Sequence, residues 1–367
     1  MKTATVTFHA AHNYGSVLQA YALQQTILGL GHENRIIDFR TACQVDLYNV
    51  FTKRKGARYF VKNLCRGMHY SALKKKHHRF EAFIGSKLLL TEERYTSFQE
   101  LEQADLDYDC YVAGSDQIWN PIPADFDWVY YLPFIKSGKR IAYAPSLGPF
   151  SSVGDEKVQK QIAEYVSMFD HVTVRDNDAA EKMYKLTAST PQVVVDPTLL
   201  LDKVTWESLV TPKRIHEGRY IFFYTLFADS EMIDMVKALS KKFGLPVVVS
   251  NFSNQHDVLN PFEKHYDSGP LEFLNLIYHA DMVITSSFHG TAFSVIFQKK
   301  LYSIRGNRDA RISTLLNAVG MSECVVSNVE DIRKKDIGTP DYRVVEQKLH
   351  QLAESSKSIL KDMLAED

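Results

Sequence analysis

Residues 285–293 combine residue types that suit the binding of an anion. They read TSSFHGTAF, in which an apolar strand pattern ends, small hydroxyl residues follow and a helix begins. Backbone N–H groups at a helix start have no intrahelical partner and the helix dipole is positive there, so a phosphate or carboxylate is stabilised. A glycine at this place would let a ligand approach the backbone closely. The segment therefore predicts an anion site made by Ser286, Ser287, Phe288, Gly290 and Thr291.

His289 stands in the middle of this segment, where a strand gives way to a helix. Imidazole groups exchange protons near neutral pH, so this side chain could donate a proton or hold a phosphate. The same position also suits a histidine that only packs beside a serine-capped helix. The sequence leaves both interpretations open.

Arg175 directly follows the strand-like residues 171–174, so we expect it at the carboxyl end of a strand. Ligands of open α/β sheets bind at that end, and a fixed guanidinium group fits a phosphate or carboxylate in a bidentate way. The alternative is a surface ion pair between Arg175 and Asp176 or Asp178.

Three further arginines follow the strand-like residues 301–304, namely Arg305, Arg308 and Arg311. They could add positive charge near the helix of His289. They could equally be ordinary surface charges.

Two polar loops of the first half suit a sugar. The loop 12–16 precedes a helix and offers Asn13, Tyr14, Gly15 and Ser16, and the loop 114–121 follows a strand and offers Ser115, Asp116, Gln117 and Trp119. Carboxylate, amide and hydroxyl groups bind sugar hydroxyls, and an indole can cover a ring face. An Asx-type turn that packs Trp119 is the alternative for the second loop.

Residues 53–79 contain ten Lys or Arg, with no acid between Asp46 and Glu81. Such a run usually forms a solvated helix face. It could also contact an anionic membrane surface or an acceptor carried on a lipid diphosphate.

Two strings of alternating strand and helix patterns must position these groups, which indicates parallel sheets covered by helices. The first string runs from the strand pattern at residues 3–9 to that at 192–195, and the second restarts near Arg219. The second string includes strand patterns at 247–249 and 282–285 and helix patterns at 291–297 and 310–319, and the linker between the strings is expected within 198–218. We therefore predict an N-terminal domain over residues 1–205 and a C-terminal domain over 206–345. A polar helix over 346–367 can return to the first domain.

Composition excludes several classes of protein. The net charge of −1 gives no global field for nucleic acid, and the four cysteines are scattered without the spacing of a zinc site. No G-x-G-x-x-G or P-loop motif is present, and no apolar segment approaches the roughly 20 residues of a membrane span. We expect a cytoplasmic enzyme without a metal or cofactor.

Four segments in order resemble the polysaccharide pyruvyl transferase family. They are NYGSVLQAYALQ at 13–24, GSDQIWNP at 114–121, VDPTLL at 195–200 and SFHGT at 287–291. The segments APSLG at 144–148 and RISTLL at 311–316 extend the likeness. The resemblance implies an α/β fold of two Rossmann-like lobes facing a cleft, similar to GT-B glycosyltransferases.

The resemblance also implies the reaction and the roles of residues. Pyruvate would move from phosphoenolpyruvate to a sugar as a cyclic ketal, in the synthesis of cell-surface polysaccharide. The basic run 53–79 adds the alternative that the cytoplasmic enzyme works at the inner face of the membrane. His289 and Arg175 would act on the donor, and Asp116 could activate a hydroxyl of the acceptor. Some members carry an arginine where this chain has Ser287, so Arg305, Arg308 or Arg311 would supply that charge.

Two other functions fit the same residues. A glycosyltransferase that uses a nucleotide sugar would also need two lobes and an anion-binding helix, because a fold does not determine a function. A sugar-binding or assembly protein without catalysis is the third reading.

Overall fold

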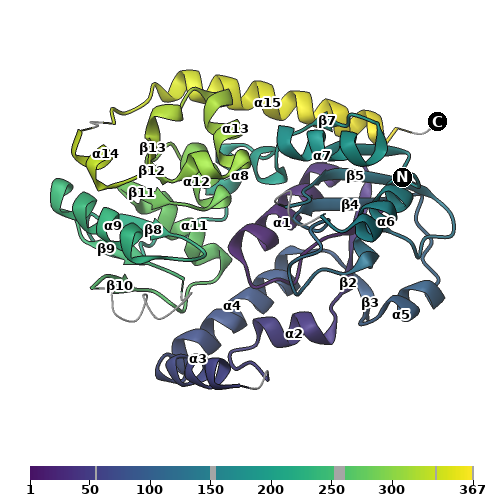
Figure 1. Cartoon of the computed structure of the whole chain (residues 1–367), viewed down its shortest axis with the longest axis horizontal. Helices are drawn as coiled ribbons and strands as arrows, with labels where there is room; N and C mark the ends of the chain where they lie inside the picture. Colours follow the sequence, from purple (N-terminus) through teal and green to yellow (C-terminus); the bar gives the residue numbers. More distant parts are fainter. Residues whose placement is uncertain (54–55, 149–153, 252–260, 335–336, 366–367) are drawn as a thin grey trace. The chain divides into compact units, whose positions relative to one another are not determined.

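The computed structural model describes residues 1–53, 56–148, 154–251, 261–334 and 337–365 (Figure 1). The chain divides into two compact units. Unit 1 consists of Met1–Asn49, Glu81–Leu201 and Gln351–Asp367, and unit 2 consists of Val50–Phe80 and Asp202–His350. The division drawn from the sequence differs in placing residues 50–80 with the first domain.

Unit 1 contains a seven-stranded parallel sheet in the order β3-β2-β1-β4-β5-β6-β7. The central strand β4 is buried at each of its positions, as expected for a parallel sheet covered on both faces. The strands are β1 (Lys2–Val6), β2 (Glu33–Phe39), β3 (Leu90–Tyr95), β4 (Cys110–Asp116), β5 (Lys139–Pro145), β6 (His171–Val174) and β7 (Gln192–Val193).

The helices of unit 1 start at polar caps that the sequence supplies. Asn13 caps α1, Ser97 caps α5, Asp155 caps α6 and Asp176 caps α7, each through its side-chain oxygen. The helices are α1 (Tyr14–Gly29), α2 (Ala42–Tyr48), α5 (Phe98–Gln103), α6 (Glu156–Val166) and α7 (Asn177–Thr187).

Unit 2 contains a six-stranded parallel sheet in the order β10-β9-β8-β11-β12-β13. Its strands are β8 (Ile221–Tyr224), β9 (Val247–Val249), β10 (Glu263–Lys264), β11 (Met282–Thr285), β12 (Lys300–Ile304) and β13 (Val325–Val326). Its helices are α3 (Ala57–Met68), α8 (Lys203–Glu207), α9 (Ser230–Phe243), α11 (Pro270–His279), α12 (Phe288–Ile296), α13 (Ala310–Val319) and α14 (Val329–Lys334).

Two helices contribute to both units. Helix α4 (Tyr70–Lys87) passes from unit 2 to unit 1 after Phe80, and α15 (Tyr342–Met363) does so after His350. In unit 1 the end of α15 places Leu360, Met363 and Leu364 in a buried cluster with residues of α1 and β4. No helix in the described ranges is long and apolar enough to cross a membrane.

Both sheets wind outward in two directions from their middle. The reversal falls between β1 and β4 in unit 1 and between β8 and β11 in unit 2. At such a switch point neighbouring connections leave in opposite directions, which opens a crevice at the carboxyl ends of the two strands. Ligands of doubly wound sheets bind at such switch points, and each unit has one.

The sequence patterns locate the regular elements closely. β6, β9, β11 and α13 have the predicted bounds, whereas α12 begins three residues earlier than the predicted start at Thr291. Helix α12 is longer because Ser287, in extended conformation, is its N-cap. The predicted linker 198–218 contains the short helix α8, and α2 to α5 and β3 were not predicted.

Candidate functional site

Hydroxyl groups join the ends of β8 and β11 at the switch point of unit 2. The Ser286 and Thr225 hydroxyl oxygens are 2.6 Å apart, and the Thr285 hydroxyl donates to the carbonyl of Tyr224 at 2.7 Å. Thr285 Oγ1 also accepts from the backbone N–H of Ser287 at 3.0 Å. These bonds fix the turn that leads into α12.

The start of α12 lacks a serine cap. Ser287 has the extended backbone of an N-cap, but its side chain accepts no hydrogen bond from the first turn. The Thr291 hydroxyl instead donates to the Ser287 carbonyl at 3.0 Å, one turn into the helix. A helix start whose N-cap side chain does not occupy the first-turn N–H groups keeps the anion-binding character predicted from the sequence.

His289 is the second residue of α12 and is buried, with 7% of its surface exposed. Its ring meets the Phe288 ring edge-on at 5.2 Å between centroids. His289 is therefore a buried residue of the first turn of α12 whose ring packs on Phe288.

Gly290 has a packing role in unit 2, and its expected part in admitting a ligand stays a prediction. A Cβ at this position would lie 2.3 Å from Thr285 Oγ1 and 3.0 Å from the ring of Tyr224. The space beside Gly290 is thus filled by β8 and β11. Glycine lets the first turn of α12 pack directly on the ends of these strands.

Acidic neighbours balance two of the three arginines that follow β12. Arg305 pairs with Asp229 at 2.6 Å and with Glu231. Arg311 pairs with Asp309 at 2.6 Å, and its guanidinium carbon lies 5.7 Å from the centre of the Phe288 ring. Arg308 is exposed on a short 3-10 turn. Of the three, Arg311 is joined to the start of α12 by a ring contact.

The two polar loops of the first half meet at the switch point of unit 1. The Asn13 side chain accepts from the N–H of Gly15 at 2.9 Å and so caps α1. The Ser16 hydroxyl donates to Asp116 Oδ2 at 2.6 Å, joining the start of α1 to the end of β4. Tyr14 is buried in the same first turn. The structure thus brings together residues 100 positions apart, as the shared sheet edge predicts.

Asp116 has a left-handed backbone, with φ of 77°. Its Oδ1 accepts from the N–H of Gln117 at 2.8 Å. Ser115 is buried and donates to the carbonyl of Ala144 at 2.7 Å, and Gln117 accepts from the side chain of Asn120 at 2.9 Å. Internal hydrogen bonds therefore occupy the polar groups beside Asp116 and hold its carboxylate in place.

Arg175 is buried between two carboxylates. Its Nη1 lies 2.7 Å from Asp196 Oδ2 and its Nη2 lies 3.7 Å from Asp116 Oδ1. The surface pair considered from the sequence is wrong, because Asp176 caps α7 and Asp178 pairs with Lys182. Arg175, Asp116 and Asp196 carry one formal negative charge together. This cluster therefore orients Asp116 and does not by itself attract an anion.

Trp119 packs inside unit 1, as the alternative reading of its loop predicted. It is fully buried, stacks on Tyr131 at 4.8 Å, and donates from Nε1 to the carbonyl of Tyr130 at 3.1 Å. Its ring faces are therefore not available to a sugar.

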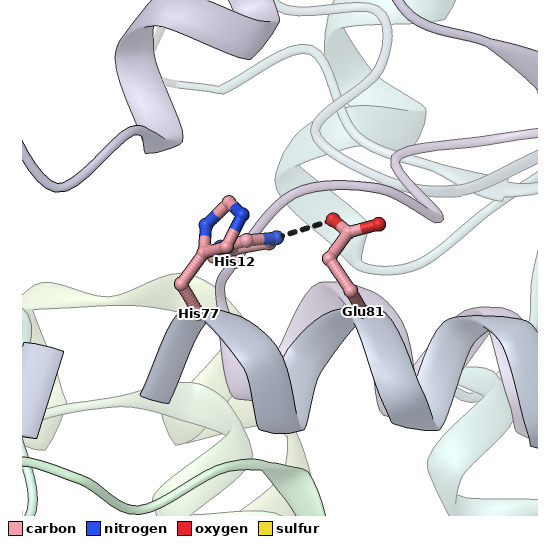
Figure 2. Close-up of side chains that lie close together, drawn as sticks. All are labelled: His12, His77 and Glu81. Carbon is pink, nitrogen blue, oxygen red and sulfur yellow. Dashed lines mark hydrogen bonds and ion pairs between the residues drawn. The ribbon is translucent and has the colours of Figure 1, made fainter. Parts of the chain in front are cut away.

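A chain of charged groups at the ends of β1 and β2 was not predicted from the sequence. Asp38 Oδ1 lies 2.9 Å from His9 Nε2 and 2.5 Å from Arg40 Nε. Glu81 then lies 2.9 Å from Arg40 Nη1. Its carboxylate also lies 2.8 Å from His12 Nε2 (Figure 2). The motif Asp38-Phe39-Arg40 at the end of a strand was the signal that could have found it. Glu81 comes from a distant helix and gave no local signal.

The pairing lowers the pKa of both carboxyl groups in this chain. Burial alone would raise the pKa of Glu81, but its hydrogen bond with His12 and the charge of Arg40 outweigh burial and lower the pKa to about 2. The pKa of Asp38 is lowered well below its ordinary value, because His9, Arg40 and Arg94 together outweigh its burial. Both groups are ionised at neutral pH.

One cluster among the described residues has metal-ligand types within unit 2. His216, Glu263 and His265 place one ligand atom each within 4.8 Å of one another. Both imidazoles lie within hydrogen-bond distance of Glu263 Oε1, at 2.9 and 2.7 Å. Imidazole and carboxylate groups suit a divalent transition metal. Mutual hydrogen bonding already accounts for this half-exposed arrangement.

Solved structures with the same arrangement of elements define the fold class. A UDP-N-acetylglucosamine 2-epimerase is 13% identical, with 99% of this chain and 95% of that chain covered and a TM-score of 0.55. The putative UDP-N-acetylglucosamine 2-epimerase from Listeria monocytogenes is 11% identical, with 100% and 98% covered and a TM-score of 0.52. The enzyme from Methanocaldococcus jannaschii in complex with UDP-GlcNAc and UDP is 12% identical, with 96% and 100% covered and a TM-score of 0.51.

Two α/β units, each with a doubly wound parallel sheet, therefore place the chain in the GT-B-like class of folds. At these identities the likeness concerns the fold alone. The model of the polysaccharide pyruvyl transferase family matches residues 13–307, and the chain belongs to that family. A search of curated protein sequences gives no match.

The packing role of Gly290 predicts a loss of stability on substitution. Gly290→Ala should lower the free energy of unfolding by about 1–3 kcal/mol, because the added methyl group overlaps Thr285 and Tyr224. Gly85→Ala is the matched control, since a Cβ on this helical glycine meets nothing within 4 Å and should be neutral or stabilising. Urea unfolding of the full chain measures both. Equal stability of Gly290→Ala and wild type would contradict the packing role.

The charged chain of unit 1 predicts a loss of stability in acid. The folded pKa of Glu81 lies below the ordinary value of about 4.3, so its contribution is full above about pH 5 and is lost as the pH falls toward 2. The thermal unfolding midpoint should therefore fall between about pH 5 and 3, and fall less in Glu81→Gln. Glu102→Gln, at an exposed position of α5, should keep the wild-type profile. Identical profiles for Glu81→Gln and wild type would refute this account.

Proposed function

We propose that this protein transfers pyruvate from phosphoenolpyruvate to two hydroxyl groups of a sugar, forming a cyclic ketal and inorganic phosphate. The observation that carries the proposal is the family match over residues 13–307, which includes the switch-point residues of both units. The acceptor would be a sugar of a cell-surface polysaccharide, such as an exopolysaccharide, carried on a lipid diphosphate at the inner face of the membrane.

The start of α12 is the proposed donor site. Phosphoenolpyruvate carries a carboxylate and a phosphate, and both are stabilised by backbone N–H groups at the positive end of a helix. The absence of a Ser287 side-chain cap and the hydroxyl of Ser286 support this assignment. Arg311, which pairs with Asp309 and lies over Phe288 in the first turn, is the arginine proposed to contact the donor phosphate through its N–H groups.

His289 would transfer the proton on which the chemistry depends. A proton adds to the methylene carbon of phosphoenolpyruvate, and the adjacent carbon gains oxocarbenium character. One sugar hydroxyl attacks that carbon, the C–O bond to phosphate breaks, and a second hydroxyl closes the ketal. The two hydroxyl protons balance the new methyl C–H bond and the released phosphate. The reaction proposed here requires no metal or cofactor.

Asp116 is the proposed group of unit 1 that accepts a proton from an acceptor hydroxyl. It is held by the Ser16 hydroxyl and by the guanidinium of Arg175. We assign Arg175 to positioning Asp116, because Asp196 balances its charge at 2.7 Å. Asn13, Tyr14, Gly15, Ser115 and Gln117 would shape the acceptor side of this unit.

Binding of phosphoenolpyruvate provides the test. Millimolar phosphoenolpyruvate should raise the thermal unfolding midpoint of the wild type, because a ligand that binds only the folded state stabilises it. His289→Ala should lose most of the shift. His350→Ala, at an exposed position of α15, is the matched control and should keep it.

Two results would count against the assignment. A shift of wild-type size in His289→Ala would remove the histidine from the donor site. A shift with a nucleotide sugar and none with phosphoenolpyruvate would favour glycosyl transfer. Arg175→Ala is a poor probe, since it would leave Asp196 buried without its partner and destabilise the fold.

A further inference from the structure

Helix α3 turns its apolar face to the solvent. Its large apolar side chains at helical spacing are strongly exposed: Phe60 by 71%, Val61 by 55%, Leu64 by 63% and Met68 by 64%. Residues three, four and seven or eight apart share one face of a helix, so these four form a continuous apolar stripe. A helix of a water-soluble domain ordinarily buries such a stripe.

Two polar side chains of α3 bond to the segment that precedes the helix. Asn63 exchanges two hydrogen bonds with the backbone of Thr52, at 3.0 and 3.2 Å. Arg66 donates to the carbonyl of Val50 at 3.2 Å, and burial lowers the pKa of this guanidinium. Helix α3 is therefore attached through polar side chains, and its apolar stripe faces the solvent. This exposure indicates that the stripe has a partner outside unit 2.

Aromatic and basic groups border the stripe in the sequence. Phe51 and Tyr70 are 42% and 44% exposed and stack on one another at 5.5 Å. Lys74 lies 6.0 Å from the centre of the Tyr70 ring, and Lys53 and Lys74 are exposed. Aromatic rings and lysines beside an apolar helix face are typical of segments that lie at a lipid headgroup boundary.

The basic run of residues 53–79 is only partly available for such a contact. Lys75 and Arg79 pair with Asp267 at 2.9 and 3.0 Å, and Lys76 donates to Asn251 at 3.3 Å, which fixes the first half of α4 to unit 2. Residues 54–55 lie outside the described residues. Replacement of Lys74, Lys75 and Lys76 together would therefore disturb the fold as well as the surface.

Charge decides between a membrane and a second copy of the chain. No acidic residue occurs between Asp46 and Glu81, so two copies that joined their α3 stripes would bring two acid-free basic segments together. Like charges repel at such distances, whereas an anionic lipid surface attracts them.

We propose that the α3 stripe, Phe60, Val61, Leu64 and Met68, docks this protein on an anionic membrane surface, with the stripe inserted among the lipids. The contact is peripheral and reversible, and it does not depend on the proposed reaction. Its strength combines burial of apolar side chains with attraction of the basic segment, so it should weaken with salt without vanishing.

Vesicle flotation of the full chain tests this docking. The protein should float with vesicles of phosphatidylcholine and phosphatidylglycerol, and much less with phosphatidylcholine alone. The double variant Phe60→Ser/Leu64→Ser should bind about tenfold or more weakly, because two apolar side chains no longer transfer to the lipid. Tyr184→Ser/Val204→Ser is the matched control, since these side chains are 57% and 72% exposed elsewhere, and it should bind as wild type does.

The unfolding free energies of the three proteins should agree within about 0.5 kcal/mol per exposed substitution, so loss of binding would not reflect loss of fold. Three outcomes would overturn the proposal: no flotation of the wild type, equal flotation of Phe60→Ser/Leu64→Ser, or a wild-type dimer in sedimentation that this variant abolishes. The last outcome would identify the stripe as a self-association face. Flotation that falls in the variant at both low and high salt supports the lipid contact.

Discussion

In the middle of each parallel sheet the connections between strands change direction. The position of the polar groups described above depends on this change. Where connections leave neighbouring strands in opposite directions, polar side chains satisfy backbone groups at the carboxyl ends of those strands. In unit 2 the Thr285 hydroxyl donates to the carbonyl of Tyr224, and the Thr225 hydroxyl donates to the carbonyl of Phe227. In unit 1 Asp116 Oδ1 accepts from the N–H of Gln117.

The two switch points differ in charge, and this difference suits two kinds of ligand group. At the switch point of unit 1 the charged groups are paired, and Arg175 is offset by Asp116 and Asp196. Unit 2 offers the first turn of α12, where a helix dipole and backbone N–H groups act without a side-chain cap from Ser287. A neutral sugar with hydroxyl groups suits the first environment, and an anionic donor suits the second. In the proposed reaction, unit 1 would therefore bind the acceptor sugar and unit 2 the donor.

Local patterns were enough to predict many of the elements, because apolar strands such as Val247–Val249 and capped helices such as Ala310–Val319 depend on neighbours in sequence. They did not predict α2 to α5 or β3. The two polar loops were predicted, and the structure adds that Ser16 of one bonds to Asp116 of the other at the same edge of one sheet. Long-range partners did not follow. The residues around Arg175 in the sequence do not predict its ion pair with Asp196, and those around His12 do not predict its contact with Glu81. The packing role of Gly290 required the positions of Thr285 and Tyr224.

The transfer reaction itself, run in heavy water, tests the central claim most directly. Phosphoenolpyruvate, the protein and the lipid-linked glycans of a polysaccharide-producing cell would be incubated, and the product analysed by mass spectrometry and NMR. The account predicts a cyclic pyruvate ketal whose methyl group carries one deuterium, with one inorganic phosphate released per ketal. Transfer of a sugar from a nucleotide sugar, with no ketal formed and phosphoenolpyruvate intact, would contradict it.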